Sequence, residues 1–329
     1  MTNESSLRQR LWRTLALVVL LAVPLTSFSQ SYPTKPIRLV VPFDPGGATD
    51  ILGRLVCVEL TLALSQPCIV ENRSGGGGNI GTGLVVNADP DGYTLLVGAA
   101  GNITINPSLF AKMPFDPAKD LAPVALVAST MNVLVVRPSL AAESVKDLIE
   151  LARKNPGKLT YASAGVGGTQ HLSAELFKKA AGVEAVHVPY KGSGPAMVGL
   201  LGDQTDLMFD NMPSALPRVQ AGSLRALAVT GKVRSKHLPN VPTVHEAGIP
   251  NFEATSWFGI FAPSRTPPAV IERLHGAIDA ALKKPAVLER ISTLGAEAQP
   301  LSPNEFRALI AADTVKWREA VKQSGARVE

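Results

Sequence analysis

The stretch VVPFDPGGATD at residues 40–50 is built like a second stretch much later in the chain, TYASAGVGGTQH at residues 160–171. Each runs from a β-type segment through small residues to a pair of glycines and then into an amphipathic helix. The start of a helix leaves backbone N–H groups without internal partners and carries a partial positive charge, so it attracts anions. Glycine lets a ligand approach the backbone closely and permits positive φ. Two such helix starts, one in each half of the chain, are suited to hold a small carboxylate between them.

The first residues have the pattern of a secretory signal. Three arginines precede the apolar run 15–25, and Ser27 and Ser29 then place small residues at positions −3 and −1 of a cleavage site. The run is shorter than the ~20 apolar residues of a membrane span. A signal peptide, residues 1–29, cleaved near Ser29, is therefore favoured over a retained membrane anchor. We expect an exported protein.

Length and charge narrow the class of protein further. The chain has 329 residues and a formal net charge of +5. The predicted signal holds three arginines and one glutamate, so its removal lowers the charge from +5 to +3. The remaining lysines and arginines are scattered, which makes nucleic acid a poor candidate for a partner. Roughly 300 residues would remain, enough for about two domains.

Two cysteines, Cys57 and Cys68, lie eleven residues apart. Export permits a disulfide between them, and two small buried apolar side chains are the alternative, which the sequence leaves equally open. No histidine or acidic residue stands at metal-site spacing from either cysteine. We therefore expect no zinc site and no other metal or cofactor.

Strand-like and helix-like segments alternate along the chain. Short runs rich in leucine and β-branched residues, without polar alternation, are typical of parallel sheets covered on both faces. The pattern starts at residue 37 and begins again near residue 133, which predicts an α/β fold. The expected strands are 37–41, 69–71, 94–98, 133–136, 159–162, 186–188, 206–209 and 224–229, with a further apolar run at 257–261. The expected helices include 49–65, 144–154, 169–181, 196–201, 216–221, 270–282 and 304–323.

Further motifs stand between these elements. They are PF-x-PGG-x-x-D at 42–50, ENR-x-G-x-GGNIG at 71–81, DPDGYT at 89–94 and VPYKG at 188–192, with matching positions in 162–172, 206–210 and 257–259. In this order they resemble the Bug-type receptors, which are the substrate-binding proteins of tripartite tricarboxylate transporters. The resemblance covers nearly all of the chain after the predicted signal.

The resemblance implies a type II periplasmic binding-protein fold with two lobes, each a mostly parallel sheet flanked by helices, joined by a two-segment hinge. Residues 30–129 and 254–329 would form lobe 1 and residues 130–253 lobe 2, with the ligand in the cleft between them. It also implies a periplasmic receptor, expected to be monomeric. The receptor would close on a small organic acid or acidic amino acid and deliver it to the inner-membrane permease.

The resemblance assigns the ligand contacts to loops at the carboxyl ends of strands, where open α/β sheets bind ligands. Phe43 would pack on the carbon skeleton of the ligand, and the glycines would offer backbone N–H groups. Hydroxyl groups would come from Ser163 and Thr169, while Asp210 would order water or accept from a ligand donor. The expected ligand-binding residues are Phe43, Gly46, Gly47, Ser163, Gly165, Gly167, Gly168, Thr169, Tyr190 and Asp210.

Some of these residues also have a purely structural interpretation. Gly46 and Gly47 can simply end a strand and begin a helix, although the second glycine pair at residues 167–168 favours ligand contact. Tyr190 is open between the two interpretations. Asp50 fits a first-turn acid at the helix dipole as well as a ligand contact. His171 fits a structural hydrogen bond as well as a contact with the ligand.

Asp44 departs from the small or apolar residue that the family has at this position. A negative charge that faced the cleft would disfavour a polyanion and favour a ligand with a cationic group. A side chain that faced solvent would have no such effect.

Residues 76–81, GGGNIG, match the dinucleotide-binding pattern G-x-G-x-x-G. The next strand, 94–98, ends without the acid that would bind a ribose, so a cleft loop or a tight packing turn is favoured. The chain has no G-x-S-x-G, H-E-x-x-H or P-loop lysine motif, so we expect no enzyme activity. A ligand-sensing subunit for a membrane histidine kinase is the alternative with the same fold, and an exported hydrolase is the alternative of another class.

Overall fold

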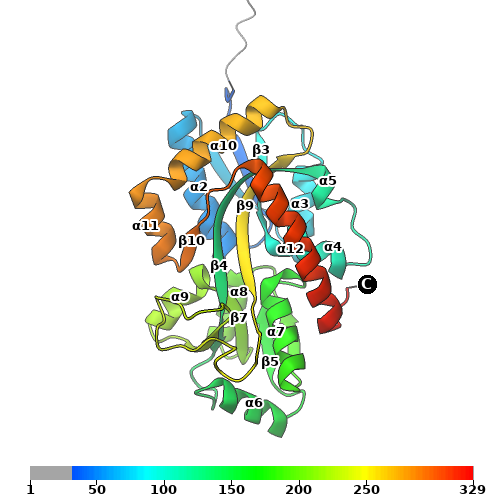
Figure 1. Cartoon of the computed structure of the whole chain (residues 1–329), viewed down its shortest axis with the longest axis vertical. Helices are drawn as coiled ribbons and strands as arrows, with labels where there is room; N and C mark the ends of the chain where they lie inside the picture. The colour runs from blue at the N-terminus through cyan, green and yellow to red at the C-terminus, as the bar shows by residue number, and fades with distance from the viewer. Residues whose placement is uncertain (1–31, 329) are drawn as a thin grey trace, which may run out of the picture. The chain divides into compact units, whose positions relative to one another are not determined.

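The computed structural model describes residues 32–328, and its helices and strands lie in one compact unit that starts at Lys35. The predicted signal peptide, residues 1–29, and its cleavage position lie outside the described residues. One curved sheet with the strand order β2-β1-β3-β9-β4-β7-β5-β6 runs through the unit, with helices packed around it (Figure 1). Among residues 32–328 no helix is both long and apolar enough to cross a bilayer.

The first βαβαβ segment, residues 37–99, forms one end of the sheet. Its strand β1 lies between β2 and β3 and runs parallel to both. Four of the five residues of β1 are buried, as expected of a central strand with helices on both faces. The elements are β1 (Ile37–Val41), α2 (Ala48–Leu64), β2 (Cys68–Asn72), η1 (Gly76–Gly78), α3 (Asn79–Val86) and β3 (Thr94–Ala99).

The second βαβαβ segment, residues 160–211, forms the other end and repeats this topology. Strand β5 lies between β6 and β7 and is parallel to both, as β1 is to β2 and β3. The elements are β5 (Thr160–Ser163), α7 (Gly168–Ala181), β6 (Val186–Pro189), α8 (Ser193–Leu201) and β7 (Leu207–Asn211). The predicted alternation of strands and helices is therefore confirmed in both segments.

Two long antiparallel strands, β4 (Leu121–Val136) and β9 (Thr255–Pro263), join the segments. β9 pairs with β3, and β4 pairs with β7 and with two short strands, β8 (Arg225–Val229) and β10 (Ala296–Ala298). All these pairings are antiparallel, so the parallel part is limited to three strands in each segment. The sequence predicted only 133–136 of β4, because Pro123 obscures its start; the β4–β9 register shifts just after this proline.

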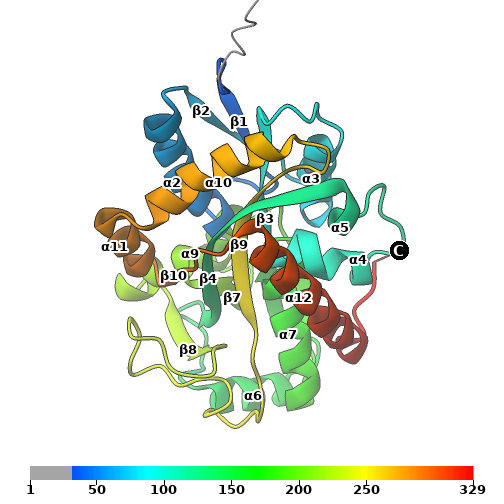
Figure 2. The ribbon, with the colours of Figure 1, turned by 45° about the horizontal axis from the view of Figure 1, so that its top comes forward.

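The remaining helices cover the sheet. They are η2 (Gly101–Ile105), α4 (Asn106–Leu109), α5 (Pro117–Asp120), α6 (Val145–Lys154), α9 (Met212–Gln220), α10 (Pro268–Leu282), α11 (Pro285–Thr293) and α12 (Pro303–Ser324). The long α12 runs beside both β9 and α7 (Figure 2). Its Phe306 packs in the apolar cluster of β3 and β9, and its Trp317 packs in the cluster of the second segment.

Cys57 of α2 and Cys68 of β2 form a disulfide with their Cα atoms 5.2 Å apart. This finding decides between the two alternatives that the sequence left open. The bond joins the first helix of the first segment to the edge strand of the sheet, on which it packs.

Candidate functional site

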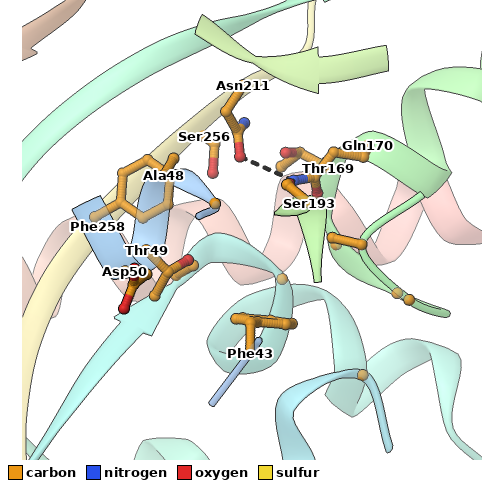
Figure 3. A pocket seen from close by; sticks show the side chains of 18 of the residues that line it. Phe43, Ala48, Thr49, Asp50, Thr169, Gln170, Ser193, Asn211, Ser256 and Phe258 are labelled. Carbon is orange, nitrogen blue, oxygen red and sulfur yellow. Dashed lines mark hydrogen bonds between the residues drawn. The ribbon is translucent and has the colours of Figure 1, made fainter. Parts of the chain in front are cut away.

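The loops that follow β1 and β5 face each other across a cavity between the two segments, which we call the inner cavity. Its empty volume is about 500 Å³, part of which is open to solvent. The first segment contributes Phe43, Gly47, Ala48, Thr49, Asp50, Gly77 and Ala99 to its walls. The other walls consist of Gly101, Ala164, Gly165, Val166, Gly167, Gly168, Thr169, Gln170, Ser193, Asn211, Ser256 and Phe258. Figure 3 shows Phe43 on one side of this space and Asn211 on the other.

Helix α2 begins at the cavity wall without a side-chain cap. Gly47 is its N-cap residue, and no side chain bonds to the first N–H groups. Gly46 has φ +94°, a conformation that glycine adopts without strain. The loop also touches the second segment, because the backbone N–H of Asp44 donates to Lys191 O at 2.9 Å. The free donors of the first turn of α2 therefore lie at the cavity, where an anion can accept from them.

Asp50, in the first turn of α2, holds this loop in shape. Its side chain accepts hydrogen bonds from Gly46 N–H at 3.1 Å and from Asn72 Nδ2 at 3.0 Å. Asn72 Nδ2 also donates to Phe43 O at 2.9 Å, so it reaches the middle of the loop. Arg54 forms an ion pair with Asp50 at 2.9 Å. Burial raises the pKa of the Asp50 carboxyl, but the hydrogen bonds from Arg54, Asn72 and Gly46 outweigh burial and lower the pKa overall.

The second loop has three glycines in conformations that other residues rarely adopt. Gly165, Gly167 and Gly168 have φ values of +136°, +85° and +75°. Gly167 is the N-cap of α7, which also lacks a side-chain cap. A Cβ atom on Gly167 would lie 2.2 Å from Asn106 Oδ1, a contact that no real side chain could make. The loop thus presents the first turn of α7 to the cavity only with glycine at this position.

Stacked rings pack behind the second loop. The ring of His187 lies 4.6 Å from that of Tyr161 and 4.3 Å from that of His171, measured between centroids. His187 Nε2 lies 2.6 Å from Ser163 Oγ, which in turn donates to Gly165 O at 2.8 Å. His171 Nδ1 accepts from Gly167 N–H at 3.4 Å. The rings therefore support the loop from behind through two hydrogen-bonded contacts.

Burial keeps both imidazoles neutral. It lowers the pKa of His171 to about 4, against a smaller opposite effect of Glu175. It lowers the pKa of His187 to about 3, with the neighbouring His171 acting in the same direction. The charged groups around the stack are Glu175 and Lys178 of α7, which pair with each other at 2.8 Å. Glu175 also accepts from the Tyr161 hydroxyl.

A layer of polar side chains lies at the end of β7. Asp210 is completely buried and accepts from Ser193 Oγ at 2.8 Å and from Ser214 Oγ. Burial raises the pKa of Asp210 to about 6, although the bonds from Ser214 and Ser193 act against it.

Asn211 connects this layer to the cavity wall. Its Oδ1 accepts from Gln170 Nε2 at 2.9 Å (Figure 3), and its Nδ2 donates to Asn132 Oδ1 at 2.5 Å. Asn132 of β4 thus positions Asn211 of β7, and Asn211 in turn holds the side chain of Gln170.

Among residues 32–328, no lysine or arginine lines the inner cavity. Its one charged lining residue, Asp50, is already paired with Arg54. The polar groups that remain are neutral side chains and the backbone N–H groups at the starts of α2 and α7. Such a site can bind an anion without removing water from a cation.

Six of the predicted ligand-binding residues line the inner cavity: Phe43, Gly47, Gly165, Gly167, Gly168 and Thr169. The other four do not. Gly46 is exposed and packs near Gly194, while Ser163 and Asp210 are fully buried behind the wall. Tyr190 lines a neighbouring chamber, and its hydroxyl group lies 3.4 Å from Gln204 Oε1.

Two further residues, Asp44 of the first motif and Trp257 of the motif at 257–259, also stand outside the wall. Asp44 is partly exposed and absent from the lining of the inner cavity. Trp257 is buried against Phe306, and its Nε1 donates to Asp313 Oδ2 at 2.8 Å.

The GGGNIG motif forms a cleft loop, which is one of the two alternatives given above. A Cβ atom on Gly77 would lie 2.2 Å from Val166 O in the second loop, and Gly77 lines the inner cavity. The sequence did not indicate Ser193, Asn211, Ser256 or Phe258 as lining residues. Ser256 and Phe258 lie on β9, and only the long-range pairing of β9 with β3 and β4 brings them to the site.

Known proteins are similar to this chain over most of its length. The family model for the tripartite tricarboxylate transporter family receptor matches residues 52–326. Protein BugT of Bordetella pertussis is 38% identical over 310 residues, which are 94% of this chain and 94% of BugT. The structure of R. palustris Rpa4515 with adipate has a TM-score of 0.88 at 38% identity and covers 90% of this chain and 100% of that one. MatC from Rhodopseudomonas palustris with bound malate has a TM-score of 0.85 at 32% identity, with 88% and 100% covered.

The family match spans most of the chain, and relatives at this level of identity share the arrangement of the whole sheet and its helices. The chain therefore belongs to the Bug-type receptors of the tripartite tricarboxylate transporter family and has their two-lobed periplasmic binding-protein fold.

Proposed function

We propose that this protein is a periplasmic solute receptor that binds a small organic carboxylate in the inner cavity and delivers it to the permease of a tripartite tricarboxylate transporter. The observation that carries the proposal is the meeting of two uncapped helix starts, at Gly47 and Gly167, on one cavity without a cation in its wall. The adipate of the Rpa4515 structure and the malate of MatC support the same chemical class.

The carboxylate would lie between the first turns of α2 and α7. Backbone N–H groups there donate to its oxygens, and the positive ends of both helix dipoles stabilise its charge. Each helix end contributes up to about 2 kcal/mol when it is partly buried. The hydroxyl groups of Thr49 and Thr169 are further donors in the wall. Waters can bridge the remaining contacts at little cost.

The division into lobes at residues 130 and 254 belongs to this proposal. It is supported by the pairing of β4, which pairs with β9 up to Met131 and with β7 from Asn132 onwards. A rotation at this point and at the start of β9 would open the cavity and release the ligand, as hinge motions do in binding proteins. Helix α12 packs on both segments and would have to slide on one of them during opening.

Calorimetry and thermal unfolding with malate, adipate and hexanoate test the proposal, with the matching neutral amides as controls. An acid at ~100 times its Kd should add about 2.7 kcal/mol to the free energy of unfolding. The amides should add nothing measurable, because they lack the charge that the helix starts attract. Amides that bind as tightly as the acids would contradict the anion site.

Gly167→Val is the matching variant. Its side chain would collide with Asn106 at a backbone φ that valine does not adopt, so the variant should lose at least ~100-fold in affinity. It should still unfold cooperatively. Gly276→Ala in α10 is the control, because an added Cβ meets no atom within 4 Å there. A Gly167→Val protein that keeps its affinity would refute the placement of the ligand.

A further inference from the structure

The two segments touch at the edge of the inner cavity along a strip that we call the glycine seam, in which residues 44–47 lie against residues 191–194. A Cβ atom on Gly47 would lie 3.2 Å from Ser193 Cβ, so the loop after β1 rests directly on the start of α8. Gly47 and Ser193 also line the inner cavity, whereas Pro45 is exposed. The seam therefore runs from the cavity wall to the surface of the protein.

Two glycines of the second segment make the closest approach in the seam. A Cβ atom on Gly194 would lie 2.0 Å from Pro45 O. A Cβ atom on Gly192 would lie 2.9 Å from Asp44 N and 3.1 Å from Asp44 O. The opposing atoms belong to the backbone, which cannot rotate away as the end of a long side chain can. The seam as it stands therefore leaves no room for any side chain at positions 192 and 194.

The second segment itself does not require glycine at these two positions. Gly194 lies in α8 without a positive φ, and Gly192 has φ 164° and ψ 167°, an extended conformation that any residue adopts. The three atoms nearest to an added Cβ belong, in both cases, to residues 44–46 of the first segment. Gly77 differs, because it also touches the opposite segment but has φ +63°, which its own loop demands. Only the approach of the first segment excludes side chains at 192 and 194.

We propose that Gly192 and Gly194 are positioning residues for ligand binding, which let the two segments close until the starts of α2 and α7 reach the same carboxylate. This inference rests on the proposed function. The two helix starts belong to different segments, so a ligand contacts both only at the separation that the seam fixes. The hydrogen bond from Asp44 N–H to Lys191 O, 2.9 Å long, forms at the same separation. A side chain in the seam would hold the segments apart and shift the population toward the open form, which binds the ligand less tightly.

The variant Gly194→Ala tests the seam, with malate and adipate as the ligands. Its affinity in calorimetry should fall at least ~10-fold, as expected when a methyl group is forced into a filled space. Stopped-flow tryptophan fluorescence should show faster dissociation and an association rate constant within about twofold of the wild type. The free energy of unfolding without ligand should not fall, because the open form has room for the methyl group and alanine favours a helix more than glycine does. Gly192→Ala should act in the same direction with a smaller loss, since its overlap is smaller.

Gly276→Ala is the matched control, because it makes the same change inside helix α10, where an added Cβ meets no atom within 4 Å. It should leave the affinity and both rate constants unchanged. Wild-type affinity in both Gly194→Ala and Gly192→Ala would overturn the seam while leaving the inner site in place. An equal loss of unfolding free energy with and without ligand would also overturn it, because the seam would then be fixed packing that never opens. If neither acid binds the wild type, the proposed function falls together with this inference.

Discussion

The two βαβαβ segments have the same topology and each places a glycine loop at the cavity, but they hold these loops by different means. In residues 37–99 the loop is fixed by an ionised side chain, Asp50, with its partners Arg54 and Asn72. In residues 160–211 the loop is backed by the neutral rings of His171 and His187. The same position of the fold is thus stabilised once by a charge and once by stacked aromatic groups.

The contrast extends to the bond between the first helix and the outer strand of each segment. In the first segment the disulfide Cys57–Cys68 joins α2 to β2. In the second segment the His171–His187 contact joins α7 to β6, on the side near the cavity. The first link is covalent and independent of pH over the ordinary range, whereas the second depends on two groups that titrate. The two segments should therefore respond differently to reduction and to acid.

Removing the disulfide should have the largest effect on stability. A bond that closes a loop with a sequence separation of 11 contributes about 3 kcal/mol by limiting the unfolded chain. The double variant Cys57→Ser with Cys68→Ser should lose this amount in urea unfolding and retain its ligand affinity. The wild type in reducing agent should match the variant. A variant that also loses affinity would show that the bond shapes the cavity as well.

Replacing Asp50 should have a smaller effect on stability and a clear effect on binding. Asp50→Ala leaves Gly46 N–H without its acceptor and removes one of the two acceptors of Asn72 Nδ2, so it should cost about 1–3 kcal/mol and weaken ligand binding. Asp279→Ala breaks an exposed pair with Lys283 at the same i, i+4 spacing and should cost less than ~0.5 kcal/mol.

The pH dependence of the same carboxyl has a definite sign. The pKa of Asp50 is lowered in the folded state, so its contribution is present above the pKa of the unfolded chain and is lost as the pH falls through the folded value. The difference between wild type and Asp50→Ala should therefore shrink in acid. A difference that stays constant with pH would show that the charge is not what holds the loop.

The histidine stack should have the smallest effect at neutral pH, where both imidazoles are neutral, and its contribution should appear as a change in the slope of stability against pH as the pH falls. The pKa values of His171 and His187 are lowered to about 4 and 3, so below their ordinary value of 6.5 the unfolded chain takes up protons that the folded protein does not. Stability should fall as the pH falls from 6.5 toward 4. Asp210, with its pKa raised to about 6, acts in the opposite direction between 3.8 and 6.

His187→Gln should show a smaller loss of unfolding free energy than the wild type between pH 6.5 and 4, measured by urea unfolding. The Asp210 effect is common to both proteins and cancels in the comparison. Parallel curves for wild type and variant would exclude the stack as the acid-sensitive part of the second segment.

The sequence predicted the parts of the fold that depend on local pattern. The glycine pairs and the buried runs around β1 and β5 located both loops, and six predicted residues of these loops line the inner cavity. Ser163 was expected to face the ligand but turns toward His187, because Gly165, two residues later, has a φ of +136° that lets the loop backbone curl over the Ser163 hydroxyl group. A side-chain direction of this kind depends on φ values that no local pattern specifies.

Contacts between distant parts of the chain were not predictable in the same way. Phe258 and Ser256 reach the cavity through the register of β9, and Val328 lies beside Phe110 through an isolated parallel bridge. The disulfide was also undecided, because the distance between Cys57 and Cys68 depends on how α2 packs on β2. In each case the deciding distance is set by tertiary packing.

The register of β9 also bears on the order in which the protein can fold. In the first segment, β3 pairs with β1 on one side and with β9 on the other. The second pairing joins Leu96 to Phe261, which comes much later in the chain. The second segment instead pairs with residues 132–136 of β4, which precede it directly. All pairing partners of the strands in the second segment precede β9 along the chain, the last of them being β8. Closing the longer loop costs more chain entropy and is slower. The segment that comes first along the chain is therefore the one that is finished last.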